Sequence, residues 1–184
     1  MACSLREISV VAIRWLSALF LLLSCSACGR PENAPRAVSR IDLARYAGIW
    51  YEIARYPNRF EKNCAGAMAI YRVLDDGGLE VVNRCRDITD GGRIREIKGY
   101  AKVPDPLNPA ELKVTFFWPF YGHYWIIALS EDYTWAVVGH PQRKYLWILA
   151  RQPVLDQGVL QKILSLIVEQ GYEPERLVFA DQGK

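Results

Sequence analysis

The strongest constraint on the fold is a series of short segments in which apolar and polar residues alternate, separated by turn-forming residues. Residues 111–117 show the pattern most clearly, with Leu112, Val114 and Phe116 on one face and polar side chains between them. Alternation with a period of two is typical of a β-strand that buries one face. The pattern predicts eight strands, at residues 50–56, 65–73, 79–85, 93–103, 111–117, 124–129, 133–138 and 145–151.

Short connections between these segments favour an all-β fold, an eight-stranded up-and-down antiparallel β-barrel. The sequence Asp75-Asp76-Gly77-Gly78, between the second and third segments, is a strong hairpin signal. Closing the sheet removes its unpaired edges. A sandwich of two sheets would bury similar faces and stays open as an alternative at this point.

One helix is predicted after the last strand. Asp156 is a suitable N-cap, apolar residues recur at helical spacing from Val159 to Val168, and Gly171 can end the helix. A single apolar stripe means that this C-terminal α-helix packs on the outside of the barrel. Residues 177–180 can add a short final strand.

Composition excludes some classes of protein. The net charge is only +3 over 184 residues, whereas a nucleic-acid-binding protein usually carries a clear excess of Lys and Arg. The chain has two histidines, His123 and His140, which leaves little room for a His-rich metal site. We therefore predict no nucleic acid, metal or other cofactor.

Residues 1–24 have the features of a signal peptide. Arg6 and Arg14 precede an uncharged run at 15–23, and small residues follow it. The run is too short to span a bilayer. An uncleaved membrane anchor that begins at Ile8 is an alternative, but it would place Arg14 in the hydrocarbon.

A cysteine after the small residues predicts a lipid anchor. Leu-Leu-Ser-Cys25 resembles the lipobox of bacterial lipoproteins, in which the cysteine is acylated; Cys28, after Ser-Ala, is the second candidate, and cleavage without acylation is a third interpretation. No aspartate follows either cysteine. In bacterial lipoproteins, a residue other than aspartate after the acylated cysteine resembles the signal for sorting to the outer membrane. We expect residues 25–40, of which 29–40 are rich in proline and charge, to form a flexible tether. This tether would join a barrel domain (residues 41–184) to the outer membrane, with the barrel facing the periplasm.

Three short motifs follow one another in the predicted strands: Gly48-Ile49-Trp50, Glu131-Asp132-Tyr133 and a final Arg151. Together they resemble the signature motifs of the lipocalins, and the chain resembles the outer-membrane lipocalins of bacteria. Ala136 departs from the second motif, which often has an aromatic residue there. Because the strand directions alternate, we expect all three motifs at the same end of the barrel. This end is referred to as the base. The resemblance implies structural roles for Gly48, Trp50, Asp132, Tyr133 and Arg151, with the Arg151 guanidinium stacked on the Trp50 indole.

The same strand directions place Cys64 and Cys85 together at the opposite end, called the mouth. Because a cell-envelope address permits oxidation, we predict a disulfide between them. Two free thiols are the alternative. A cysteine nucleophile, as in one isomerising lipocalin, is a further alternative that would need an activating base.

The interior of an eight-stranded barrel has room for side chains or for one small ligand. Strand parity predicts which residues line it, although a solid interior is the alternative. The predicted ligand-binding residues are Glu52, Ala54, Ala67, Tyr71, Val81, Asn83, Leu112, Val114, Phe116, Trp118, Trp147 and Leu149.

A mostly apolar lumen with an excess of cations in the mouth loops suits a single-chain lipid with an anionic head. We predict a fatty acid or a lysophospholipid, and the lipocalin resemblance implies the same. The expected function is to bind and to store or transport such lipids for membrane maintenance, without catalysis. Alternatives are an enzyme, a haem or pigment carrier that uses His123 or His140, and a structural domain with a filled lumen. Residues 118–121 at the mouth are a lid, a membrane-touching tip or a homodimer contact.

Overall fold

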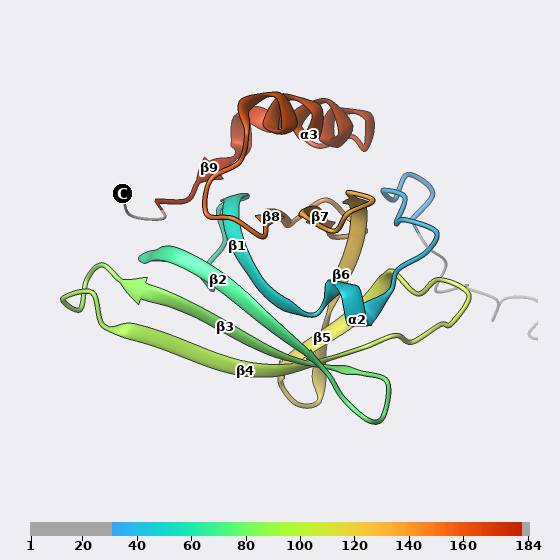
Figure 1. The fold of residues 1–184 in the computed structure, drawn as a ribbon, viewed down its shortest axis with the longest axis horizontal. Helices are drawn as coiled ribbons and strands as arrows, with labels where there is room; N and C mark the ends of the chain where they lie inside the picture. The colour runs from blue at the N-terminus through green and yellow to red at the C-terminus, as the bar shows by residue number, and fades with distance from the viewer. Residues whose placement is uncertain (1–30, 182–184) are drawn as a thin grey trace, which may run out of the picture. The chain divides into compact units, whose positions relative to one another are not determined.

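The computed structural model describes residues 31–181 (Figure 1). The predicted signal peptide and both candidate anchor cysteines, Cys25 and Cys28, lie outside the described residues. The described residues from 33 to 181 form one compact unit. Its elements are α2 (Leu43–Tyr46), β1 (Gly48–Arg55), β2 (Cys64–Val73), β3 (Leu79–Asp87), β4 (Ile94–Lys102), β5 (Glu111–Phe117), β6 (Phe120–Leu129), β7 (Trp135–Gly139), β8 (Leu146–Ala150), α3 (Gln157–Glu169), the 3-10 turn η1 (Pro174–Arg176) and β9 (Val178–Phe179).

The strands form a closed antiparallel barrel. Neighbours in the sheet follow the order β2-β3-β4-β5-β6-β7-β8-β1, and β1 also pairs with β2. The short strand β9 adds to the mouth end of β1. This arrangement confirms the predicted barrel with one outer helix and excludes the sandwich.

Most predicted strand boundaries lie within two residues of the observed ones. The largest difference is β6, which begins at Phe120 instead of residue 124 because β5 and β6 are joined by a tight turn at residues 118–119. The helix α2 was not predicted. It has four residues, and the Asp42 side chain caps it by accepting hydrogen bonds from the backbone N–H groups of Ala44 and Arg45.

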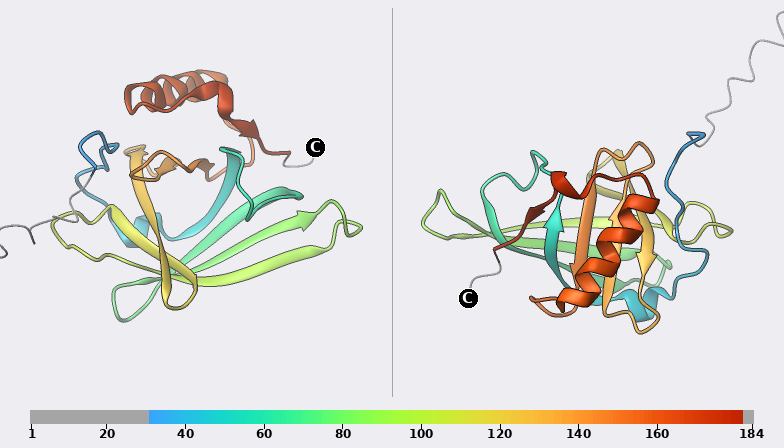
Figure 2. Two further views of the ribbon diagram at one scale, coloured as in Figure 1. Left: turned by 180° about the vertical axis from the view of Figure 1, so that it is seen from behind. Right: turned by 90° about the horizontal axis from the view of Figure 1, so that it is seen from above.

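Two separate apolar clusters hold the barrel together. The lumen cluster includes Trp50, Tyr71, Val81, Leu112, Ile126 and Leu149. The helix-side cluster joins the outer faces of β1, β6, β7 and β8 to Ile163 and Ile167 of α3, and Figure 2 shows α3 lying across these strands. The α3 helix begins as predicted, with Asp156 accepting hydrogen bonds from the N–H groups of Gly158 and Val159.

A bulge in β1 changes which residues face the lumen. Glu52 pairs with Leu149, but the next pair is Ala54 with Ile148, so that Ile53 is an extra residue on β1. After the bulge the parity reverses. Ala54 therefore lies in the helix-side cluster, and its predicted place in the lumen is wrong.

The segment before α2 contacts the barrel. The N–H of Val38 donates to the carbonyl of Ile126 at 2.9 Å, the N–H of Arg36 donates to the Gln170 side chain, and Ala34 packs on the helix-side cluster. Residues 34–38 are thus held on the barrel, contrary to the prediction that they belong to a free tether. Their alanines and valine bury apolar surface despite the neighbouring proline and charges.

Within residues 31–181, no helix has the length and apolar character needed to cross a bilayer.

Candidate functional site

The base of the barrel is organised by Arg151, which follows β8. Its Nη2 donates to the carbonyls of Arg45, Tyr46 and Ala47 at 2.7–3.1 Å, and its Nη1 donates to that of Ile49 at 2.9 Å. The guanidinium carbon lies 3.9 Å from the centre of the Trp50 ring. The cation thereby satisfies the open carbonyls at the end of α2 and covers the indole.

Gly48 sits where a larger residue would disturb this arrangement. Its φ of +99° favours glycine, and a Cβ at this position would lie 3.1 Å from Nη1 of Arg151. The glycine of the first motif therefore allows the arginine of the third to approach the backbone.

The second motif shapes the turn before β7. The Asp132 carboxylate accepts hydrogen bonds from the N–H and hydroxyl of Thr134. A hydrogen bond with the Ser130 side chain, together with these two bonds, lowers the pKa of Asp132. The Tyr133 hydroxyl accepts a hydrogen bond from the N–H of Asp42 at 2.8 Å, and the Arg45 guanidinium lies over its ring. Residues of all three motifs therefore lie together at the base. Their contacts connect the turn before β7 and α2 to the barrel strands.

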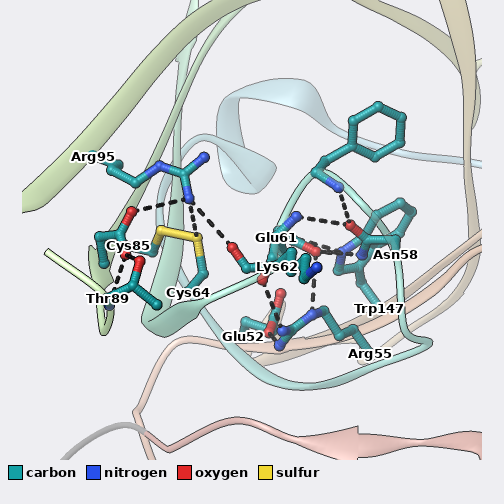
Figure 3. Close-up of a disulfide and its surroundings, with 12 residues drawn as sticks. Glu52, Arg55, Asn58, Glu61, Lys62, Cys64, Cys85, Thr89, Arg95 and Trp147 are labelled. Atoms are coloured by element: carbon teal, nitrogen blue, oxygen red, sulfur yellow. Dashed lines mark hydrogen bonds and ion pairs between the residues drawn. A yellow bond between two sulfur atoms is a disulfide. The ribbon is translucent and has the colours of Figure 1, made fainter.

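The mouth carries a disulfide between Cys64 and Cys85, with an S–S distance of 2.02 Å (Figure 3). It links the start of β2 to the end of β3, as predicted. Neither thiol is therefore free to act as a nucleophile.

Most of the predicted lining residues face the lumen. Tyr71, Val81, Leu112 and Leu149 belong to the lumen cluster, and Val114, Phe116 and Trp147 pack against it. Asn83 pairs with Ala69 of that cluster, and Ala67 is buried on β2.

Trp118 is different, because 82% of its surface is exposed. It lies in the tight turn between β5 and β6, where the chain reverses, so the strand parity used for the prediction no longer applies. Its predicted place in the lumen is wrong.

Three phenols that the sequence analysis did not connect form a chain in the lumen. The Tyr124 hydroxyl lies 2.7 Å from the hydroxyls of both Tyr46 and Tyr71. Burial raises the pKa of all three groups, so they carry their protons. Three hydroxyl protons serve two bonds within the triad, which leaves one proton for an acceptor outside it.

A polar cluster occupies the mouth end of the lumen (Figure 3). Arg55 contacts Glu52 at 2.6 Å and Glu61 at 3.4 Å. Glu61 also accepts hydrogen bonds from Nε1 of Trp147 and from Nδ2 of Asn58. Burial, with the negative charge of Glu61, raises the pKa of Glu52 to about 8. The bulge at Ile53 turns Arg55 inward, and strand alternation alone does not predict it.

Comparison with known proteins identifies the family of this chain. The family model described as a lipocalin-like domain matches residues 41–182. The outer membrane lipoprotein Blc of Escherichia coli is 39% identical over 166 residues, which cover 90% of this chain and 93% of that protein. The chain is a lipocalin. Mouse apolipoprotein D is more distant, at 31% identity over 82% of each chain.

Solved structures support the fold of this lipocalin. Insecticyanin from the tobacco hornworm superposes with a TM-score of 0.65 at 21% identity, covering 83% of this chain and 86% of that one. Lipocalins are binding and transport proteins for small hydrophobic ligands. The lumen is therefore the candidate binding site of this member.

The two histidines of this lipocalin lie outside the lumen cluster. His123 stacks edge-on against His140, with ring centres 5.4 Å apart, and against Trp125 of the helix-side cluster. Burial lowers the pKa of both rings, for His140 to about 4. A haem carrier that ligates through these rings would thus hold its cofactor away from the lumen.

One surface groove of about 390 Å³ lies outside the barrel. It is lined on β1 to β3 by residues that include Tyr51, Met68, Arg84 and Arg86. None of its lining residues belongs to the lumen cluster, so the groove is separate from the candidate binding site.

Proposed function

We propose that this lipocalin binds a fatty acid or a lysophospholipid in its lumen, and stores or transports it without chemical change. The observation that carries the proposal is the combination of an apolar lumen with a buried arginine, Arg55, near its open end. An acyl chain can contact Leu112, Val114 and Leu149 while its anionic head lies near Arg55.

The energy of such binding comes mainly from the chain. Each buried methylene contributes about 0.8 kcal/mol, so a chain of about twelve carbons supplies on the order of 9 kcal/mol before association costs are subtracted. The spare proton of the tyrosine triad offers a hydrogen bond to a water molecule beside the chain.

The proposed location is the outer membrane, with the barrel facing the periplasm. The similar protein of Escherichia coli is named an outer membrane lipoprotein, and the sequence before Cys25 resembles a lipobox. Acylation at Cys25, or alternatively Cys28, would hold the barrel close to the membrane whose lipids it carries. A homodimer through residues 118–121 stays a prediction.

Native mass spectrometry tests the proposal. The chain from residue 29 onward lacks the predicted signal peptide and both candidate acylation sites, keeps the compact unit that begins at residue 33, and is purified without detergent. We expect masses of single-chain lipids that dodecanoate displaces. If no lipid mass is bound, and if the protein takes up no fluorescent fatty acid, the lumen is a solid core and the proposal fails.

A further inference from the structure

The mouth of the lumen contains a carboxylate, that of Glu61, which accepts hydrogen bonds from Trp147 and Asn58 and is ion-paired with Arg55. We propose that Glu61 is an internal substitute for the ligand: the anionic head of a single-chain lipid binds to Arg55, Trp147 and Asn58 and displaces the Glu61 side chain. This inference rests on the proposed function and names the head-group subsite and its competitor.

The geometry around Glu61 is that of an anion site. Oε2 accepts hydrogen bonds from Nε1 of Trp147 at 3.0 Å and from Nδ2 of Asn58 at 2.5 Å, and it lies 3.4 Å from Nε of Arg55. A lipid carboxylate or phosphate presents the same kind of acceptor oxygens. The donors that hold Glu61 can therefore hold a head group without rearrangement of the strands.

Arg55 is incompletely satisfied by Glu61. Its Nε is buried and makes no hydrogen bond within residues 31–181, although the Glu61 carboxylate is near. The side chain of Arg55 is only 12% exposed. Because leaving a buried donor unpaired is costly, an anion that approaches Nε more closely than Glu61 does would bind favourably.

The charges also favour an exchange. Glu52 and Glu61 share one guanidinium, and Glu52 is fixed on β1 at the wall of the barrel. Glu61 lies on the loop between β1 and β2, at the mouth, and its side chain is 21% exposed. Replacement of the Glu61 carboxylate by a lipid carboxylate keeps the number of buried charges constant, and it releases Glu61 to solvent.

The subsite is continuous with the lumen. Trp147 donates a hydrogen bond to Glu61 and also packs on the lumen cluster. A head group at Arg55 would thus leave the acyl chain pointing toward the base, along the apolar wall.

The test compares Glu61→Gln with the parent protein, both prepared as the chain from residue 29 onward. Dissociation constants for dodecanoate and for dodecanol, which has the same chain without the charge, are measured by calorimetry. Glu61→Gln removes the competing charge, so we expect dodecanoate to bind about tenfold more tightly and dodecanol to change less than twofold. Glu80→Gln is the matched control, because Glu80 is ion-paired with the exposed Arg72, and it should change neither constant.

A second variant tests the donor. Arg55→Met should remove the preference for dodecanoate over dodecanol, and thermal unfolding shows whether the variant is folded. If it is not, Glu61→Gln alone decides. An unchanged ratio of the two constants in Glu61→Gln overturns the inference and leaves the proposed function intact.

Two further ligands test whether the cluster binds a cationic head group or free anions instead. Tighter binding of dodecylamine than of dodecanoate would assign the cluster to a cationic head and overturn the inference. Saturable binding of acetate at the same concentrations would assign it to free anions, with the same consequence. Absence of binding by both dodecanoate and dodecanol would refute the proposed function itself, and the inference with it.

Discussion

Replacing Arg151 by methionine should lower the free energy of unfolding by roughly 4.5 kcal/mol. Each of its three guanidinium nitrogens donates at least one hydrogen bond to a main-chain carbonyl: Nε to Tyr133, Nη1 to Ile49 and Nη2 to three carbonyls at the end of α2. A bond from a charged donor contributes about 1.5–3 kcal/mol. We take the lower limit once for each nitrogen, because the group is partly exposed. Methionine keeps most of the apolar contact with Trp50. The measured change in the free energy of unfolding therefore reports the loss of the hydrogen-bond donors.

Urea unfolding, followed by circular dichroism and tryptophan fluorescence, measures this loss. Arg151→Lys keeps the charge but not the planar fork of donors, so it should recover no more than about half of the stability. Arg72→Met is the surface control, since the Arg72 side chain is 73% exposed, and it should change stability by less than about 0.5 kcal/mol. A value for Arg151→Met within 1 kcal/mol of the wild type would show that the base does not depend on these bonds.

Three other substitutions give measurable outcomes. Gly48→Ala should destabilise the protein by about 1–3 kcal/mol in the same urea assay, because φ is +99° and the new Cβ would meet Arg151; a neutral result would contradict the proposed packing. Val114→Trp should abolish uptake of a fluorescent fatty acid while the unfolding temperature changes little, whereas equal loss of both would indicate a solid interior. Glu52→Gln should remove a pH dependence of stability. The pKa of Glu52 is raised to about 8 in the folded protein, so its contribution is present below the ordinary carboxyl pKa and is lost as the pH rises to about 8. The wild type should lose on the order of 1 kcal/mol per pH unit in this interval relative to the variant, and parallel curves would refute the assignment.

The barrel could be predicted because its signals are local. Alternation marks each strand, Asp75-Asp76-Gly77-Gly78 marks a hairpin, and the spacing from Val159 to Val168 marks α3. The motif residues could be placed at one end by counting strand directions alone. These inferences depend on the period of each element and not on details of packing.

The lumen was harder to predict, because its lining depends on single-residue irregularities. One extra residue at Ile53 reverses the parity of β1, which sends Ala54 to the helix side and brings Arg55 inside. The tight turn after β5 removes Trp118 from the wall in the same way. A bulge leaves little trace in sequence, because both faces of β1 bury apolar side chains.

The two arginines at opposite ends of the barrel explain how one fold can be closed at its base and open to exchange at its mouth. Arg151 is satisfied by main-chain carbonyls, which cannot leave without unfolding α2 and the adjoining turn. Arg55 is satisfied largely by carboxylate side chains, one of which comes from a loop at the entrance. Arg151 therefore holds the base closed, because its partners are main-chain carbonyls. Arg55 can exchange a partner under the proposed displacement of Glu61, because its carboxylate partners are side chains. On the proposed function, a ligand with an anionic head would compete only at Arg55, so the proposed orientation, with the head at the mouth and the chain toward the base, follows from the partners of these two residues.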